Sequence, residues 1–207
     1  MISRQRRRTL AVTSALMLGA LAFGGCVGSQ HQDNVEATAH QGQQMVDLMP
    51  GLVLTFGEQS VSLLSETSCT SSPDPETASR NTRWTGSVGF SASSAQEGRD
   101  RAQAVREYAE STGWTTEDRA SVHPSGERLY SATRDDLTLV IEQDGGEDEP
   151  GVSFTVTSPC LEKPAGHTMT RSEFDSMYGS TDPLYPNDDR SKFTNGEPKP
   201  LPEPATS

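Results

Sequence analysis

The spacing of apolar residues changes several times along the chain, and each change predicts a different element. At the start, basic residues 4–8 precede an apolar run from Leu10 to Phe23, and two glycines then precede Cys26. This order is typical of a cleavable signal peptide. The apolar run is shorter than the roughly 20 residues that a membrane span needs. Residues 1–25 are therefore predicted to be a signal peptide.

Two stretches carry apolar residues at helical spacing. The first, expected over residues 33–49, opens with a capping-box pattern and ends before Pro50. The second begins at Ser94, which forms a capping box with Glu97, and stops at Gly113. The small alanines of the second stretch would let it approach a sheet closely. Trp114, directly after this helix, is expected to fold back onto the core.

Extended segments occupy most of the remaining chain. The run 52–56 is short and apolar, and residues 61–63 and 84–90 alternate between apolar and polar. Residues 71–82 are expected to form a loop. Three further strands are expected near Arg128–Thr133, Leu137–Glu142 and Val152–Thr157.

The last two of these strands could pair antiparallel and bury one continuous apolar face. The predicted fold is therefore α+β: a small antiparallel β-sheet with two helices packed on one face, as a two-layer sandwich. The domain is expected over residues 33–162, after a polar tether at 26–32. Residues 163–207 are rich in proline and polar residues and are expected to be mostly disordered. Within them, 171–178 could instead form a helical turn or a docking element.

The segment Leu21 to Cys26 resembles the lipobox of bacterial lipoproteins, in which small residues precede a cysteine that receives a diacylglyceryl group. The family usually has Leu three residues before the cysteine, whereas Phe23 holds that place here. Two acyl chains give a durable membrane anchor where one chain does not. The alternatives are ordinary secretion without a lipid and, given the paired arginines, twin-arginine export. The expected location is the extracytoplasmic face of the cell membrane.

The chain contains three cysteines, an odd number for an exported protein. If Cys26 carries the lipid, Cys69 and Cys160 remain as one pair in an oxidising compartment, and a disulfide is expected. The competing interpretation is a catalytic or metal-binding cysteine. It lacks a CxxC motif and a nearby histidine in the sequence.

The arrangement resembles the LppA-like small lipoproteins of actinobacteria. The shared features are the lipobox at Cys26, Cys69 ahead of a strand led by Trp84, the helix that ends at Gly113, and residues 157–160 ahead of a proline-rich tail. The resemblance rests on layout and implies a cell-surface lipoprotein of undefined activity. It brings no catalytic residues.

The charge of the chain narrows the range of partners. The formal net charge is −12, and loss of four arginines with the signal leaves about −16. Such a surface repels nucleic acid, so nucleic-acid binding is excluded. The expected partners are the membrane, through the lipid on Cys26, and an envelope protein or cell-wall component. A monomer is expected.

Residues with evident chemistry are few. The histidines have no metal-ligand partner at helical spacing (His31, His40, His123 and His167). The acidic stretch 144–149 could gather calcium but lacks the alternating spacing of a calcium loop, which favours a solvated hairpin tip. The aspartates at 182, 188 and 189 are also expected to be solvated. Trp84, Phe90 and Trp114 could line a ligand groove, but with only 6% aromatic residues they are needed in the core.

Two functional hypotheses follow. The preferred one is a noncatalytic surface module that binds through a sheet edge or a helix face, with no catalytic residue, metal or cofactor. The alternative is a cell-envelope hydrolase or metal-dependent enzyme whose site forms only in three dimensions.

Overall fold

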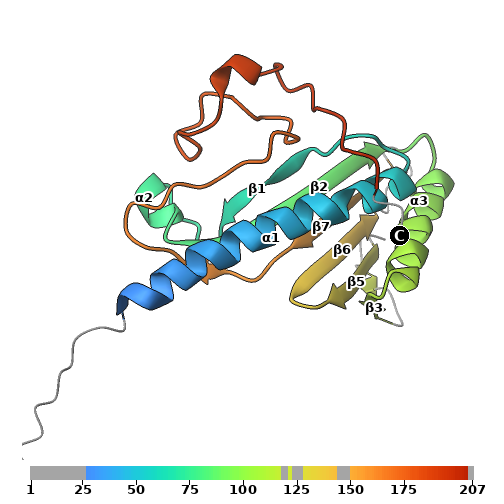
Figure 1. The fold of residues 1–207 in the computed structure, drawn as a ribbon. Coiled ribbons are helices and arrows are strands. Elements are labelled where there is room, and N and C mark those ends of the chain that lie inside the picture. Colours follow the sequence, from blue (N-terminus) through green and yellow to red (C-terminus); the bar gives the residue numbers. More distant parts are fainter. Residues whose placement is uncertain (1–26, 118–120, 123–127, 144–149, 205–207) are drawn as a thin grey trace, which may run out of the picture.

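The computed structural model describes residues 27–117, 121–122, 128–143 and 150–204, and within these ranges one antiparallel sheet of eight strands forms the larger layer (Figure 1). The predicted signal peptide, Cys26 and the acidic stretch 144–149 lie outside the described residues. The strands are β1 (Leu63–Ser68), β2 (Asn81–Ser91), β3 (Thr115–Thr116), β4 (Ser121–Val122), β5 (Arg128–Arg134), β6 (Leu137–Gln143), β7 (Gly151–Thr157) and β8 (Leu161–Glu162). The helices are α1 (Val27–Phe56), α2 (Pro75–Ala78), α3 (Ala95–Ser111) and the 3-10 helix η1 (Arg190–Lys192).

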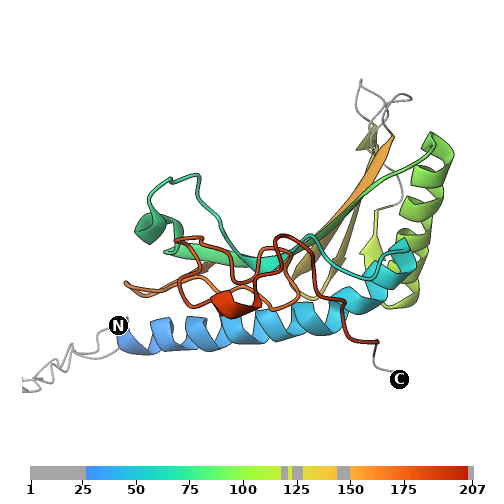
Figure 2. The ribbon, with the colours of Figure 1, turned by 90° about the horizontal axis from the view of Figure 1, so that it is seen from above.

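The strands follow the order β1-β2-β7-β6-β5-β3, with β4 paired to β5 and β8 paired to β2. Figure 2 shows α1 running along one face of this sheet and α3 crossing it at one end. The α+β class and the two helices on one face are confirmed. The predicted small sheet is wrong in size, because β1 and β2 are longer than the extended segments predicted there and the short strands β3, β4 and β8 add to the sheet.

The central strands form as their alternation predicted. In β6 and β7 every second side chain is buried, and the register places Leu139 opposite Val156 and Ile141 opposite Phe154. These side chains face the helices and form the centre of the core. Strands β5, β6 and β7 match the predicted ranges to within one residue at each end.

Helix α3 also follows its sequence signals. The Ser94 hydroxyl accepts a hydrogen bond from the backbone N–H of Glu97, as an N-cap residue does. The Glu97 carboxylate accepts from the backbone N–H of Ser93 instead of completing a box with Ser94. Gly113 adopts a positive φ of 90° after the helix, and Trp114 is 4% exposed in the core, as predicted.

Helix α1 is longer than the predicted helix at both ends. It includes the predicted tether residues 28–32 and continues through Pro50 to Phe56, so the extended run predicted at 52–56 is helical. The apolar residues on both sides of the proline lie on one helical face and are fully buried (Met45, Met49, Leu52, Val53 and Phe56). Their burial at about 2 kcal/mol each outweighs the roughly 3 kcal/mol that a proline costs inside a helix.

The signal that ends α1 is Gly57, with φ of 91°. The N–H groups of Gly57 and Glu58 bond back to the carbonyls of Leu54 and Val53. Arg101 of α3 donates to the Phe56 carbonyl at 2.7 Å, which ties the end of α1 to α3.

Two glycines in helices should respond to alanine in opposite directions. A Cβ at Gly42 of α1 would lie 2.6 Å from Cζ2 of the buried Trp84, whereas a Cβ at Gly98 of α3 would be no closer than 3.8 Å to its neighbours. We expect Gly42→Ala to lower the free energy of unfolding by about 1 to 3 kcal/mol through overpacking. We expect Gly98→Ala to raise it by about 0.5 to 1 kcal/mol through helix propensity. Urea unfolding monitored by tryptophan fluorescence measures both, and an equal effect of the two variants would contradict the close packing of α1 on β2.

The predicted disorder after residue 162 is wrong for the described part of the tail. Residues 163–204 run beside β1 with little regular structure, as the orange and red segment of Figure 1 shows. The backbone of 170–172 adds to the free edge of β1 through hydrogen bonds from Glu66 N to Thr170 O and from Ser172 N to Leu64 O. Tyr185 and Met169 form a second small core with Ala78 of α2.

Two shorter predictions are also corrected. The predicted loop 71–82 contains helix α2 and the first residues of β2. Residues 171–178 form turns instead of a helical turn, and Phe174 packs against the main core, so this stretch does dock on the protein's own domain. Among the described residues, no helix has the length and apolar character needed to cross a membrane.

Candidate functional site

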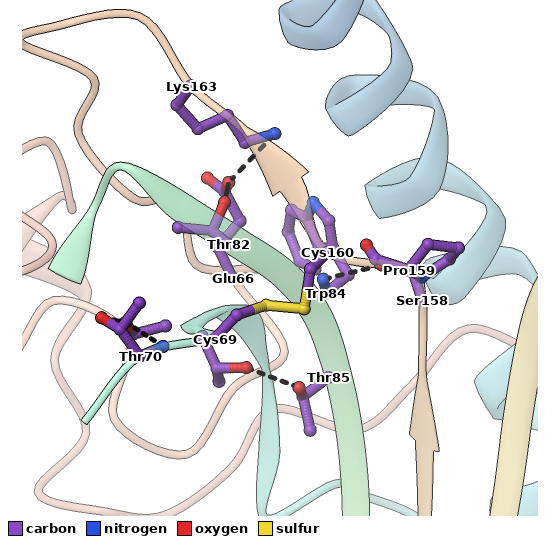
Figure 3. Close-up of a disulfide and its surroundings, with 12 residues drawn as sticks. Glu66, Cys69, Thr70, Thr82, Trp84, Thr85, Ser158, Pro159, Cys160 and Lys163 are labelled. Carbon is purple, nitrogen blue, oxygen red and sulfur yellow. Dashed lines mark hydrogen bonds and ion pairs between the residues drawn. A yellow bond between two sulfur atoms is a disulfide. The ribbon is translucent and has the colours of Figure 1, made fainter.

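A disulfide joins Cys69 to Cys160, as the cysteine count predicted (Figure 3). Cys69 follows β1, and Cys160 lies between β7 and β8. The backbone N–H of Cys69 also bonds to the Asn81 carbonyl at the start of β2. The crosslink therefore fastens the end of β1 to the chain that leads into β8, on the two sides of β2.

Beside the disulfide, Glu66 is fully buried on the helix-facing side of β1. Its carboxylate accepts hydrogen bonds from Thr82 Oγ1 at 2.7 Å and from the N–H and hydroxyl of Thr170 at 2.8 and 2.6 Å. His167 Nε2 lies 3.1 Å from Oε1. Burial alone would raise the pKa of Glu66, but the hydrogen bonds from His167, Thr170 and Thr82 outweigh it and hold the pKa at about 2.

Lys163 supplies the opposite charge. Its side chain is fully buried, and Nζ lies 3.9 Å from Glu66 Oε1. Nζ makes no hydrogen bond within the described part of the chain. Burial lowers the pKa of this amine, and the neighbouring Glu66 carboxylate opposes that shift. Figure 3 shows the Lys163 amine directed at Glu66 and Thr82.

We call Glu66, Lys163, His167, Thr82 and Thr170 the Glu66 cluster. It brings together β1, β2 and the segment after β8, and the sequence prediction missed it. The Glu66 oxygens are occupied by internal donors. A carboxylate engaged in this way is not available to act as a base on a substrate. The Glu66 cluster is therefore better suited to attaching the C-terminal segment to the sheet than to catalysis.

Arg171 forms a second attachment point. Its side chain is 5% exposed, with Asp182 at 3.0 Å, Asp188 at 3.2 Å and Asp175 at 3.7 Å. Its guanidinium also lies 3.8 Å from the ring centroid of Tyr185. The prediction of solvation is wrong for Asp188, whose side chain is 5% exposed, whereas Asp182 pairs with Arg171 and stays partly exposed. Asp189 is exposed as predicted and caps η1.

The aromatic residues belong to the core, as the sequence favoured. Trp84 and Trp114 are 6% and 4% exposed, and Phe90 packs against the core with Arg101 stacked 3.4 Å from its ring centroid. Trp84 and Trp114 are therefore too buried to line an open groove, whereas Phe90 borders a hollow of about 480 Å³ between β2 and β7.

An open groove lies instead between α1 and the turn that joins β5 to β6. It consists of two adjoining hollows of about 500 and 570 Å³ that share His40, Gln44 and Leu137. We call this the α1 groove. The first hollow is also lined by Gln43, Asp47, Leu48, Gly51, Tyr108, Thr112, Arg134 and Pro204, and the second by Ala37, Gln41, Asp135, Asp136, Pro159 and Leu161.

Several side chains of the groove are positioned by neighbours. Gln43 Nε2 donates to Asp47 at 2.8 Å, and Gln41 Oε1 accepts from the Ser158 hydroxyl at 3.1 Å. Arg134 lies 3.8 Å from Asp135, which has a positive φ of 51° at the tip of the turn. The groove is therefore open to water and lined by both polar and apolar side chains, and neighbours hold some of the polar ones in place.

Within the described residues, no group of three or more His, Cys, Asp or Glu side chains is arranged to hold a metal ion. His40 lies in the α1 groove and His167 in the Glu66 cluster. His31 has no described side chain, and His123 lies outside the described residues.

Comparisons with known proteins find little. No family model matches the chain, and no curated protein matches it. Among solved structures, the chain is similar to LppA of Mycobacterium tuberculosis, a protein named as a candidate lipoprotein, with 18% identity and a TM-score of 0.34 over 67% of this chain and 88% of that one. A likeness this small assigns neither fold nor function to the chain.

Proposed function

We propose that this chain is a lipoprotein anchored to the extracytoplasmic face of the cell membrane, and that its folded part is a noncatalytic binding module. One observation carries the first half of the proposal. The chain has three cysteines, and the structure pairs Cys69 with Cys160. A structural disulfide is typical of exported proteins, and the pairing leaves Cys26 as the remaining thiol, at the position where the lipobox pattern needs it.

The structure adds a geometric consequence to this proposal. Helix α1 begins at Val27, directly after Cys26, and Figure 2 shows its first turns extending past the sheet. A lipid on Cys26 would therefore be joined to the domain by a helix instead of the flexible tether that the sequence suggested. The domain would stand at a defined distance from the bilayer.

The second half of the proposal rests on how the polar groups are used. The buried charges of the Glu66 cluster and of Arg171 attach the C-terminal segment to the sheet. The α1 groove is open and lined by amide, carboxylate and apolar side chains. Such a surface supports binding of an envelope component by a monomeric domain.

Replacing Cys26 by alanine tests the anchor. We expect the full-length protein to be found in the membrane fraction of the producing bacterium, and most of Cys26→Ala to be found in the soluble fraction, because two acyl chains supply nearly all of the membrane affinity. The measurement is cell fractionation with mass spectrometry of the mature N-terminus. Ser29→Ala, a change of similar size in the same segment, is the control and should stay in the membrane. Equal membrane retention of both variants, or an unmodified Cys26, would reject the anchor.

A further inference from the structure

We propose that the α1 groove binds an extended cationic peptide segment of a partner protein. This inference rests on the proposed binding function and deepens it by naming the class of partner. Three features of the groove support it: its shape, its hydrogen-bonding groups and its charge.

The shape of the α1 groove suits an extended peptide better than a compact small molecule. The two hollows share His40, Gln44 and Leu137 and therefore adjoin one another. Together they follow α1 from Ala37 to Gly51, which corresponds to about 20 Å at 1.5 Å per helical residue. An extended peptide covers this length with about six residues at roughly 3.3 Å each.

The lining offers what a peptide backbone and its apolar side chains need. Gln41, Gln43 and Gln44 carry amides along one wall, and each amide can both donate and accept hydrogen bonds. Apolar side chains lie beside them (Leu48, Leu137, Pro159 and Leu161). An extended peptide matches this surface, because its backbone can hydrogen-bond to the amides while its apolar side chains contact the apolar residues.

The charge selects a cationic peptide. Asp47 lies in the first hollow, and Asp135 and Asp136 lie in the second, all exposed. Among the described lining residues the one arginine is Arg134, which lies 3.8 Å from Asp135, so these two charges offset each other. Asp47 and Asp136 therefore supply the negative charge that a cationic peptide would meet. The net charge of −12 on the whole chain also steers cations toward the surface.

A neutral glycan is less well matched. Sugar rings commonly stack on exposed aromatic faces. Tyr108 is the one aromatic residue in the lining that the structure describes, and its hydroxyl packs against Gly51 of α1, where any Cβ would clash with it. A neutral glycan would also leave the negative charge of Asp47 and Asp136 without a cation from the ligand.

The binding test uses the mature full-length protein in detergent micelles. The probe is a fluorescein-labelled peptide, Lys-Val-Thr-Lys-Val-Thr-Lys, whose β-branched residues favour an extended chain. We expect saturable binding by fluorescence anisotropy, and about ten-fold weaker binding by the variant Asp47→Asn with Asp136→Asn, since each lost charge pair is worth up to about three-fold. The variant Asp100→Asn with Glu107→Gln also removes two charges, both on exposed positions of α3 outside the groove lining, and as the matched control it should bind within about two-fold of the wild type.

Each of the following results would overturn the proposal that the α1 groove binds a cationic peptide. Equal weakening by the two double variants, in the groove and on α3, would mean attraction to overall charge and would overturn the proposal. Equal affinity for a peptide with Glu in place of Lys, or absence of binding, would overturn it as well. Binding of an N-acetylglucosamine oligomer in place of the peptide would assign the groove to glycans. Failure of the proposed function can be distinguished from failure of this proposal. Cleavage of the incubated peptide, detected by mass spectrometry, would contradict the noncatalytic role, and lipidation of Cys26 is measured in a separate experiment.

Discussion

Replacing both Cys69 and Cys160 by alanine is expected to lower the free energy of unfolding by about 4 to 5 kcal/mol. The crosslink spans a sequence separation of 91 residues. Closing a loop of this length removes much of the conformational freedom of the unfolded chain, and in the chain-entropy model the gain grows with loop length to about 4 to 5 kcal/mol. This is a large part of the 5 to 15 kcal/mol by which small domains are usually stable.

Urea unfolding under non-oxidising and oxidising conditions measures the effect. The parent protein and the variant without Cys69 and Cys160 should both carry Cys26→Ala, so that the lipidation cysteine cannot form mixed disulfides. With reductant present, the parent protein and the alanine variant should unfold at nearly the same urea concentration. A difference below about 1 kcal/mol without reductant would show that the crosslink adds little, as happens when the unfolded state is already compact.

The strands at the centre of the sheet could be predicted because local pattern and tertiary environment agree there. In β6 and β7 the alternation of apolar and polar residues matches the two faces of a sheet that is covered on one side. Helix α3 was predictable for the same reason, since its N-cap at Ser94 and its stop at Gly113 are both local signals.

Helix α1 was predicted too short because the burial of apolar residues outweighs the helix-breaking effect of a proline. Pro50 normally ends a helix. Here the residues after it continue the buried face, and Phe56 contacts both Phe90 and Phe154 at the centre of the core. The packing of Phe56 in three dimensions could not be read from the local sequence.

The C-terminal segment was misjudged because its order comes from a few buried polar contacts instead of an apolar pattern. Composition rich in proline and polar residues normally predicts disorder, since such chains bury too little apolar surface. Arg171, Lys163 and Tyr185 supply the missing attachment, and their partners lie far away in the sequence or in the tail itself.

The candidate sites also differ in whether the sequence alone could predict them. The pairing of Cys69 and Cys160 followed from counting, whereas the α1 groove could not be predicted because α1, α3 and the β5–β6 turn build it jointly. Glu66 did leave a signal in the sequence. It lies two residues after Leu64, so the two-residue period of a strand places its side chain on the same face as Leu64, which is buried in the core.

Glu66→Gln is expected to lower the free energy of unfolding by about 3 kcal/mol at pH 7. The substitution keeps the shape of the side chain but leaves Lys163, which is fully buried, without its counter-charge. Breaking a buried pair in this way typically costs about 3 to 5 kcal/mol. The matched control is Glu142→Gln, a glutamate on the exposed side of β6, and we expect it to change stability by less than about 0.5 kcal/mol.

The pH dependence of this loss has a definite sign. The pKa of Glu66 is lowered from 4.5 to about 2. A lowered pKa means that the ionised carboxylate stabilises the folded state at pH values above about 4.5, and that this stabilisation disappears as the pH falls toward 2. The shift corresponds to about 3 kcal/mol at neutral pH. The difference between wild type and Glu66→Gln should therefore shrink across this window, as measured by urea unfolding at successive pH values.

A double substitution separates the charge from the packing. Replacing Glu66 by glutamine and Lys163 by methionine in one variant removes the two buried charges together and keeps an acceptor oxygen for Thr82 and Thr170, and neutral replacement of a buried pair is often nearly neutral. We therefore expect this variant to be more stable than Glu66→Gln at pH 7 and to show no loss of stability between pH 4.5 and 2 from this site. If Glu66→Gln were as stable as Glu142→Gln, or if its deficit were unchanged at pH 2, the Glu66 cluster would not be what holds the C-terminal segment to β1.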